Sequence, residues 1–122
     1  MLGERTKNSE DRIIPLNSIA KAIIDAQRGK HEEYVFTYKG NPVLRINGHA
    51  WRKARERAGL KQCRVHDLRH TFGRRLRAAE VSFENRQDLL GHKSNRITDH
   101  YCRAEIAGLQ EAVEKLSRVN LA

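Results

Sequence analysis

The second half of the chain contains four side chains whose types and spacing suit chemistry on a phosphate. His66 and Arg69 lie three residues apart, and Tyr101 lies nine residues after His92. No other part of the sequence holds so many reactive or phosphate-binding groups at such spacing, and a packed helical domain would bring all four into one pocket. We therefore treat this stretch as the candidate site and the remainder of the chain as scaffold.

These four side chains are suited to cutting a phosphodiester without a metal. The reaction needs a hydroxyl that attacks phosphorus, cations that hold the non-bridging oxygens, and an acid that protonates the leaving oxygen. Tyr101 suits the nucleophile, provided that a base or nearby cations help to remove its proton. Arg69 offers a planar fork that matches two phosphate oxygens, while the imidazoles of His66 and His92 offer hydrogen-bond donors and a group that can exchange a proton. The set lacks only a second arginine.

The charge of the chain points to a polyanionic partner. Lys and Arg number 24 against 15 Asp and Glu, which gives a net charge of +9 in 122 residues. Between Arg52 and Arg77 ten basic residues stand against two acidic ones, a concentration typical of a nucleic-acid-binding surface. The alternative is that this run is simply a solvated helix face. The residues predicted to bind DNA are Arg52, Arg55, Arg64, Arg74 and Lys93.

Cysteine usage and hydropathy indicate the compartment. Cys63 and Cys102 have no CxxC spacing and are too few for a disulfide framework, so we expect both to be reduced. No apolar run is long enough to span a bilayer, and residues 1–12 contain no apolar signal region. We expect a cytoplasmic, nucleoid-associated protein without a membrane partner.

The chain length predicts one domain, and the residue patterns predict an α+β fold that is mainly α. We expect a β-hairpin over residues 1–16, a helical core over 17–104 with a short strand near 33–38, and a C-terminal helix over 105–122. The strand should lie along the hairpin or against a neighbouring helix, and the residues from Lys39 to Pro42 should form a turn. Leu68, Phe72 and Leu76 lie four apart and predict one buried stripe on a helix over about 67–79.

Residues that favour helix ends divide this core. Asn17 or Ser18, then Asn47, and later Ser82 are expected to cap helix N-termini, because their side chains accept hydrogen bonds from free backbone N–H groups. The expected helix ends are Gly29, Gly59 and Gly91.

Three separated boxes follow one another in the second half of the chain. The first is HDLRHTF from His66 to Phe72, the second is LLGH ending at His92, and the third is Tyr101. Their order and spacing resemble the catalytic signature of the tyrosine recombinases, the phage integrase family. The residues up to Leu16 are similar to the β-hairpin of that family, and Lys7 matches the catalytic lysine of its turn.

The resemblance implies DNA strand exchange through a covalent intermediate. Tyr101 would attack the scissile phosphate to form a 3′-phosphotyrosyl bond and release a 5′-hydroxyl. Arg69 and His92 would stabilise the phosphorane, His66 would assist proton movement or hold a phosphate oxygen, and Lys7 would protonate the leaving group. No metal or other cofactor is required, because the covalent intermediate keeps the energy of the broken bond. The C-terminal helix would suit packing onto a neighbouring protomer on DNA.

The resemblance also shows what these residues do not supply. The first catalytic arginine of the family lies well before the hairpin lysine, and no counterpart precedes Lys7 at that distance. We expect this chain to be an expressed fragment or a truncated gene product that lacks the separate N-terminal DNA-binding domain. Losing one of two phosphate-binding arginines should cost about 3–4 kcal/mol of transition-state stabilisation. The isolated chain should therefore bind DNA weakly and cleave it slowly or not at all.

Other interpretations of the same residues remain open. The chain would also suit a non-catalytic, basic DNA- or RNA-binding module, or a helical domain that inserts its last helix into the groove of a partner. Tyr101 and His66 fit a protein core, Arg69 fits a surface ion pair, and Lys7 fits a solvated turn. His66 and His70 form an HxxxH pair, but with no third ligand at helical spacing we predict no metal site.

Overall fold

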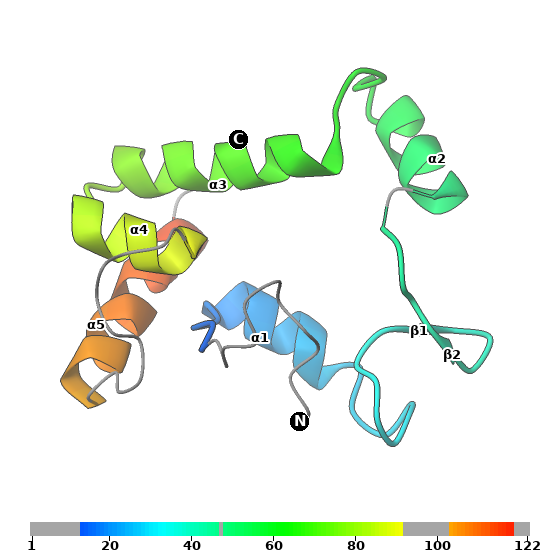
Figure 1. The fold of residues 1–122 in the computed structure, drawn as a ribbon, viewed down its shortest axis with the longest axis horizontal. Coiled ribbons are helices and arrows are strands. Elements are labelled where there is room, and N and C mark those ends of the chain that lie inside the picture. The colour runs from blue at the N-terminus through cyan, green and yellow to red at the C-terminus, as the bar shows by residue number, and fades with distance from the viewer. Residues whose placement is uncertain (1–12, 47, 92–102, 119–122) are drawn as a thin grey trace.

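The computed structural model describes residues 13–46, 48–91 and 103–118. Figure 1 shows an arrangement of helices with one small antiparallel hairpin, which confirms the predicted mainly α, α+β fold. The helices are α1 (Ser18–Asp25), α2 (His49–Arg57), α3 (Val65–Ala78), α4 (Phe83–Leu90), α5 (Arg103–Glu114) and the 3-10 helix η1 (Lys115–Ser117), and the strands are β1 (Thr37–Tyr38) and β2 (Asn41–Pro42). Among the described residues no helix combines the length and the apolar character that crossing a membrane requires.

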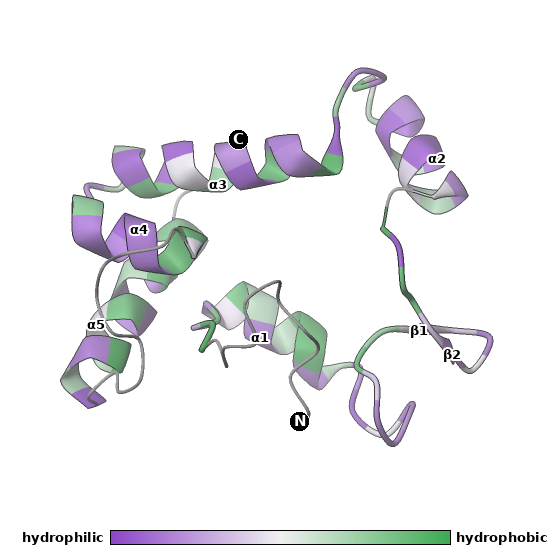
Figure 2. Cartoon of the chain, viewed as in Figure 1, coloured by the Kyte–Doolittle hydropathy of each residue, from purple (hydrophilic) through white to green (hydrophobic). Residues whose placement is uncertain are grey.

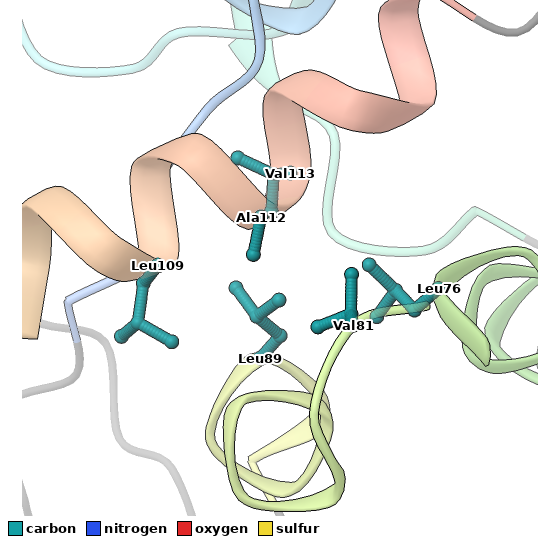
Figure 3. Packing of buried hydrophobic residues seen from close by; sticks show 6 residues of the cluster. All are labelled: Leu76, Val81, Leu89, Leu109, Ala112 and Val113. Carbon is teal, nitrogen blue, oxygen red and sulfur yellow. The ribbon is translucent and has the colours of Figure 1, made fainter. Parts of the chain in front are cut away.

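The hydrophobic core lies entirely in the C-terminal half of the chain. The end of α3, the α3–α4 turn, α4 and α5 meet there, and Figure 3 shows Leu89 of α4 directed at the α5 side chains. The buried side chains are Leu76, Val81, Leu89, Leu109, Ala112 and Val113. None of the described residues before Leu76 is buried. This cluster therefore anchors α3 at its C-terminal end.

The α3–α4 turn explains why the core forms at this point. The N–H of Val81 donates to the carbonyl of Leu76 at 3.0 Å, and that of Glu80 donates to Arg77 at 3.0 Å. This is the Schellman pattern of a helix C-terminus, in which the residue after the cap takes a left-handed conformation. Glu80 does so with φ of 58°. The pattern brings Val81 back onto Leu76, and both become part of the core.

The ends of α4 agree with the sequence prediction. The hydroxyl of Ser82 accepts a hydrogen bond from the N–H of Asn85 at 3.2 Å, which is the N-cap interaction expected of serine. Gly91 ends the helix in the left-handed region, with φ of 65° and ψ of 30°. These two residues fix the short helix between them, and with it the position of Leu90.

The predicted stripe on α3 is buried at one end only. Leu76 is completely buried and Phe72 packs against the core, but Leu68 is 50% exposed. The prediction of one continuous buried stripe was therefore wrong for Leu68. The reason is geometric, since α4 and the C-terminal helices cover the last turns of α3 and leave its first turn free (Figure 1).

The α1 helix is tied to the C-terminal helix by polar contacts. The side chain of Asn17 accepts from the N–H of Ala20 at 2.9 Å, so the predicted N-cap is confirmed. The carboxylate of Glu114 accepts from the N–H of Ser18 at 2.8 Å and from its hydroxyl at 2.7 Å. Hydrogen bonds from Ser117 and Ser18 lower the pKa of Glu114 below its ordinary value of 4.5. The helix ends at Asp25, earlier than the predicted stop at Gly29.

The strand near 33–38 is shorter than predicted and has a different partner. Only Thr37 and Tyr38 form a strand, and they pair with Pro42 and Asn41 respectively. The chain reverses at Lys39 and Gly40, whose φ values are 50° and 78°. Positive φ at both central residues is the requirement of the tight turn that suits a two-residue hairpin. The partner of β1 is thus β2 (Asn41–Pro42), which we predicted to be part of the turn.

The remaining predicted ends of these elements are only partly described. Residues 13–16 form no regular secondary structure, and the rest of the predicted hairpin over 1–16 lies outside the described residues. Asn47, the predicted cap of α2, also lies outside them, and the N-cap position is taken by Gly48. Gly59 follows α2 with φ of 70°, in the role predicted for it.

Figure 2 shows that α2 is largely hydrophilic, whereas α1 is largely hydrophobic.

Candidate nucleic-acid interface

The first turn of α3 is fixed by an acidic residue of the predicted catalytic box. The carboxylate of Asp67 accepts from the backbone N–H of Arg64 at 2.8 Å and from its guanidinium at 2.9 Å. These side-chain and backbone hydrogen bonds lower the pKa of Asp67 from 3.8 to about 2. The interaction satisfies a backbone donor at the helix start and places a negative charge at the positive end of the helix dipole. Asp67 therefore holds the N-terminal end of α3.

Two histidines project from this end of the helix. His66 and His70 lie one turn apart and are both exposed, and their ring centroids are 4.8 Å apart in an edge-to-face arrangement. Within the described parts of the chain, no group of three or more His, Cys, Asp or Glu side chains is placed to hold a metal ion. His66 is thus accessible to a ligand from solvent.

Arg69 connects the first predicted box to the second. Its guanidinium donates a hydrogen bond to the carbonyl of Leu90, the last residue of α4. One turn further along α3, a Cβ on Gly73 would lie 3.4 Å from the Cδ1 atom of Leu90. The same face of α3 therefore contacts both the backbone and the side chain of Leu90. In the sequence, Leu90 stands two residues before His92.

Four of the predicted site residues fall outside the described structure. They are the predicted catalytic residues Lys7, His92 and Tyr101 and the predicted DNA-binding residue Lys93. The described structure thus brings together His66, Arg69 and the end of the second box.

A pocket of about 660 Å³ opens between α2 and the start of α3. Basic side chains dominate its wall, including three of the five residues predicted to bind DNA. The lining residues are Gly48, His49, Trp51, Arg52, Arg55, Arg64, Val65 and His66. Since His66 also belongs to the predicted catalytic set, the pocket adjoins the candidate site.

The three arginines of the pocket are held in different ways. The guanidinium of Arg52 lies 2.9 Å from Nδ1 of His49, and because arginine stays protonated, the histidine nitrogen is the acceptor. Arg55 donates to the carbonyl of Cys63 at 3.1 Å, and its buried Nε atom has no partner among the described residues. Arg64 is occupied by Asp67. Arg52 is exposed and forms no ion pair with a carboxylate of the described residues, so its charge is available to an incoming anion.

Arg74 lies apart from this pocket. It is exposed on α3, eight residues after His66 and four after His70. Side chains at these intervals share one face of a helix. Arg74 thus extends the same exposed face away from the pocket.

The sequence prediction missed His49 and Trp51 as parts of this site. Neither residue was among the predicted site residues. Positions 49, 52 and 55 recur every three residues and so lie along one side of a helix, but this spacing does not tell which element that side meets. The hydrogen bond from Arg69 to Leu90 had no sequence signal, because a backbone carbonyl is available at every position.

Comparisons with known proteins agree with the family resemblance of the sequence. The model of the phage integrase family matches residues 1–107. The chain is 30% identical over 129 residues to the integrase of Salmonella phage P22, covering 95% of this chain and 33% of that protein. It is 31% identical over 118 residues to the tyrosine recombinase XerD of Corynebacterium glutamicum, covering 86% of this chain and 38% of that protein. The chain thus spans about a third of the length of these relatives. No solved structure matches it.

Proposed function

The chain belongs to the phage integrase family, and from this premise we propose that it carries the chemistry of site-specific DNA recombination and integration. The substrate is double-stranded DNA. The reaction is a transesterification in which the hydroxyl of Tyr101 forms a bond to phosphorus and the bond from phosphorus to the 5′ oxygen breaks. The number of phosphate ester bonds is unchanged, so the reaction needs no nucleotide as an energy source, and cationic side chains take the place of a metal at the phosphate oxygens.

Each remaining catalytic residue has a role that its chemistry supports. Arg69 and His92 hold the non-bridging oxygens of the pentavalent phosphorane, where negative charge accumulates. His66 assists removal of the phenol proton of Tyr101 or binds a phosphate oxygen, as its accessible imidazole permits. Lys7 gives a proton to the 5′ oxygen as it leaves. Reversal of the same steps joins a new 5′-hydroxyl.

The observation that carries this proposal is the contact between Arg69 and Leu90. It joins the first turns of α3, which bear His66 and Arg69, to the residue two positions before His92. In a non-catalytic helical protein nothing would require the arginine of the first box to contact the end of the helix that precedes His92 in the sequence. The contact supports a shared site for the guanidinium and the two imidazoles.

The basic residues around this site supply the contacts to the DNA backbone. We assign this role to Arg52, Arg55 and Arg64 of the pocket, to Arg74 on the exposed face of α3, and to Lys93. Contacts of this kind release counterions from DNA, so affinity should fall steeply as salt rises. They also fit a location at the nucleoid in the cytoplasm.

Two further parts of the proposal concern the isolated chain. With one catalytic arginine in place of two, cleavage is slow or absent. Self-association on DNA uses the segment 105–122, as in the predicted contact with a neighbouring protomer. Because Leu109, Ala112 and Val113 already face the core of their own chain, we assign such a contact to the outward side of α5.

Trapping of the covalent intermediate tests this function. The chain is incubated with a pool of nicked suicide duplexes whose central sequence is randomised, and denaturing gels are used to detect protein–DNA adducts. We expect a slowly formed 3′-phosphotyrosyl adduct that Tyr101→Phe abolishes without changing DNA affinity. An adduct that persists in Tyr101→Phe, or one attached through a 5′ phosphate, would overturn the mechanism.

A second candidate is a non-catalytic, basic DNA-binding module, and the arginine-lined pocket favours it independently of Tyr101. In that case DNA affinity depends strongly on salt and on Arg52, but no adduct forms at any time. Arg52→Ala should then reduce the salt dependence of binding by about one counterion.

A further inference from the structure

The pocket between α2 and α3 has a feature that binding of a DNA backbone does not require. Trp51, the one tryptophan of the chain, lines it together with Arg52 and Arg55. Guanidinium groups bind phosphate by themselves, whereas an indole ring adds a flat apolar face on which a base can stack. We propose that the pocket binds a single nucleotide unit with an unpaired base, its phosphate on the arginines and its base against Trp51.

The proposal rests on the DNA-directed function above and specifies which part of DNA the pocket takes. In an intact duplex both faces of each base are covered by its neighbours, so a side chain can stack on a base only after it leaves the helix. Such bases occur at nicks, at frayed ends and on a strand that has been cut. Because His66 lines the same pocket, the nucleotide lies next to the scissile phosphate.

The dimensions and exposure of the pocket suit this ligand. Its volume of about 660 Å³ falls within the ~300–1,000 Å³ of small-molecule sites. Trp51 is half-buried, which leaves part of the indole available. A nucleotide carries a partner for each of the two kinds of surface in the pocket, namely an anion for the arginines and an aromatic plane for the indole.

The charges within the pocket favour an anion bound near Arg52. The carboxylate of Asp67 lies on the Arg64 side and offsets that guanidinium. Within residues 13–46, 48–91 and 103–118, the side chain of Arg52 is hydrogen-bonded to Nδ1 of His49 and forms no ion pair, so no carboxylate offsets its charge there. The phosphate therefore binds on the α2 side of the pocket. The indole of Trp51, the residue before Arg52, lines the same pocket.

Trp51 also reports on occupancy, because no other tryptophan contributes to the emission. The full chain is titrated at low salt with thymidine 5′-monophosphate, deoxyribose 5-phosphate and inorganic phosphate. We expect saturable quenching by the nucleotide, which binds about 10-fold more tightly than deoxyribose 5-phosphate, the gain typical of one stacked base. Equal affinity for the two sugar phosphates, or no saturable change, would overturn the proposal.

Two exposed arginines of α2 provide a matched pair of variants. Arg52 lines the pocket and Arg57 does not, although both lie on the same helix. Arg52→Ala should weaken nucleotide binding about 10-fold, while Arg57→Ala should leave it unchanged. Trp51→Leu, measured with a labelled trinucleotide, should lose the preference for a base, and Trp51→Phe should keep part of it. Equal losses in Arg52→Ala and Arg57→Ala would indicate general charge attraction and reject the site.

A comparison of two duplexes distinguishes two possible ligands of the pocket, namely an unpaired nucleotide of a DNA strand and a free nucleotide. One duplex is blunt and the other has a short single-stranded end. Tighter binding of the second, in competition with thymidine monophosphate, identifies an unpaired nucleotide of DNA. Nucleotide binding without this preference identifies a free nucleotide. If duplexes bind but nucleotides do not, the inference fails and the proposed function stands, whereas failure of every probe rejects both.

Discussion

The two ends of α3 lie in opposite surroundings. At the C-terminal end Leu76 is completely buried against α4 and the C-terminal helices. At the N-terminal end Leu68 is 50% exposed, and His66, Arg69 and His70 are accessible around it. One helix thus combines an anchor with a polar, cationic surface, and Arg69 joins the two by its hydrogen bond to Leu90.

This difference indicates that stability and candidate chemistry are separable along the helix. Apolar burial supplies most of the free energy of folding, and it is concentrated beyond Phe72. Groups that must bind a ligand have to remain reachable by solvent, which is the condition of the first turns. Substitutions at the two ends should therefore have different effects, and each prediction below tests that expectation.

The largest effect is expected for a pair of leucines on this helix. Leu76→Ala creates a cavity in the core and should lower the free energy of unfolding by about 2–5 kcal/mol. Leu68→Ala removes the same atoms from an exposed position and should change it by no more than about 0.5 kcal/mol. Urea denaturation followed by circular dichroism measures both. Equal losses would show that the first turn is also part of a core.

A smaller loss of unfolding free energy is expected at Arg69, whose hydrogen bond to Leu90 joins the exposed first turns of α3 to α4. Arg69→Ala removes the hydrogen bond to Leu90 and should cost about 1 kcal/mol of unfolding free energy. Arg74→Ala, on the same helix and also exposed, serves as the control and should cost less than about 0.5 kcal/mol. Urea titration is again the measurement. If Arg74→Ala is as destabilising as Arg69→Ala, the contact with Leu90 does not stabilise the chain.

The same contrast explains which parts of the fold the sequence predicts. Ser82 and Gly91 bound α4 as expected, because capping is a local interaction between neighbours in the chain. The error at Leu68 has a non-local cause. A spacing of four residues identifies one face of a helix, but it does not tell how far along that face another element reaches.

The candidate site was predictable to a similar extent. The roles of His66 and Arg69 stay predictions that rest on residue type, order and family resemblance, and the structure adds the contact of Arg69 with Leu90. Trp51 and His49 were missed because their role depends on how α2 meets α3, which follows from a turn at Gly59 and not from the sequence of either helix. The partner of Thr37 was missed although it is local. Asn41 and Pro42 were predicted to be part of a turn, whereas they form the second strand of the hairpin.

A stabilising substitution is expected at the turn that closes the C-terminal end of α3. Glu80 has φ of 58°, a conformation that costs most residues about 1–2 kcal/mol and glycine almost nothing. Glu80→Gly should raise the free energy of unfolding by about 1 kcal/mol. Glu80→Ala removes the same charge but keeps the Cβ atom, so it should give no such gain. Thermal unfolding compares the two, and an equal gain in both would assign the effect to charge.

The smallest effect is expected at the opposite end, where Asp67 holds the start of α3. Its pKa is about 2 in the folded chain against an ordinary value of 3.8, so the ionised form is favoured by folding. A carboxyl with a lowered pKa contributes stability that is fully present above about pH 4 and is lost as the pH falls towards 2. Asp67→Asn should therefore be less stable than the original chain at pH 6 and equally stable near pH 2.

Because Asn still accepts a hydrogen bond at the helix start, the variant isolates the contribution of charge. Thermal midpoints measured by circular dichroism across this range provide the comparison, and a difference that does not change with pH would mean that the ionised carboxylate does not hold this end of the helix.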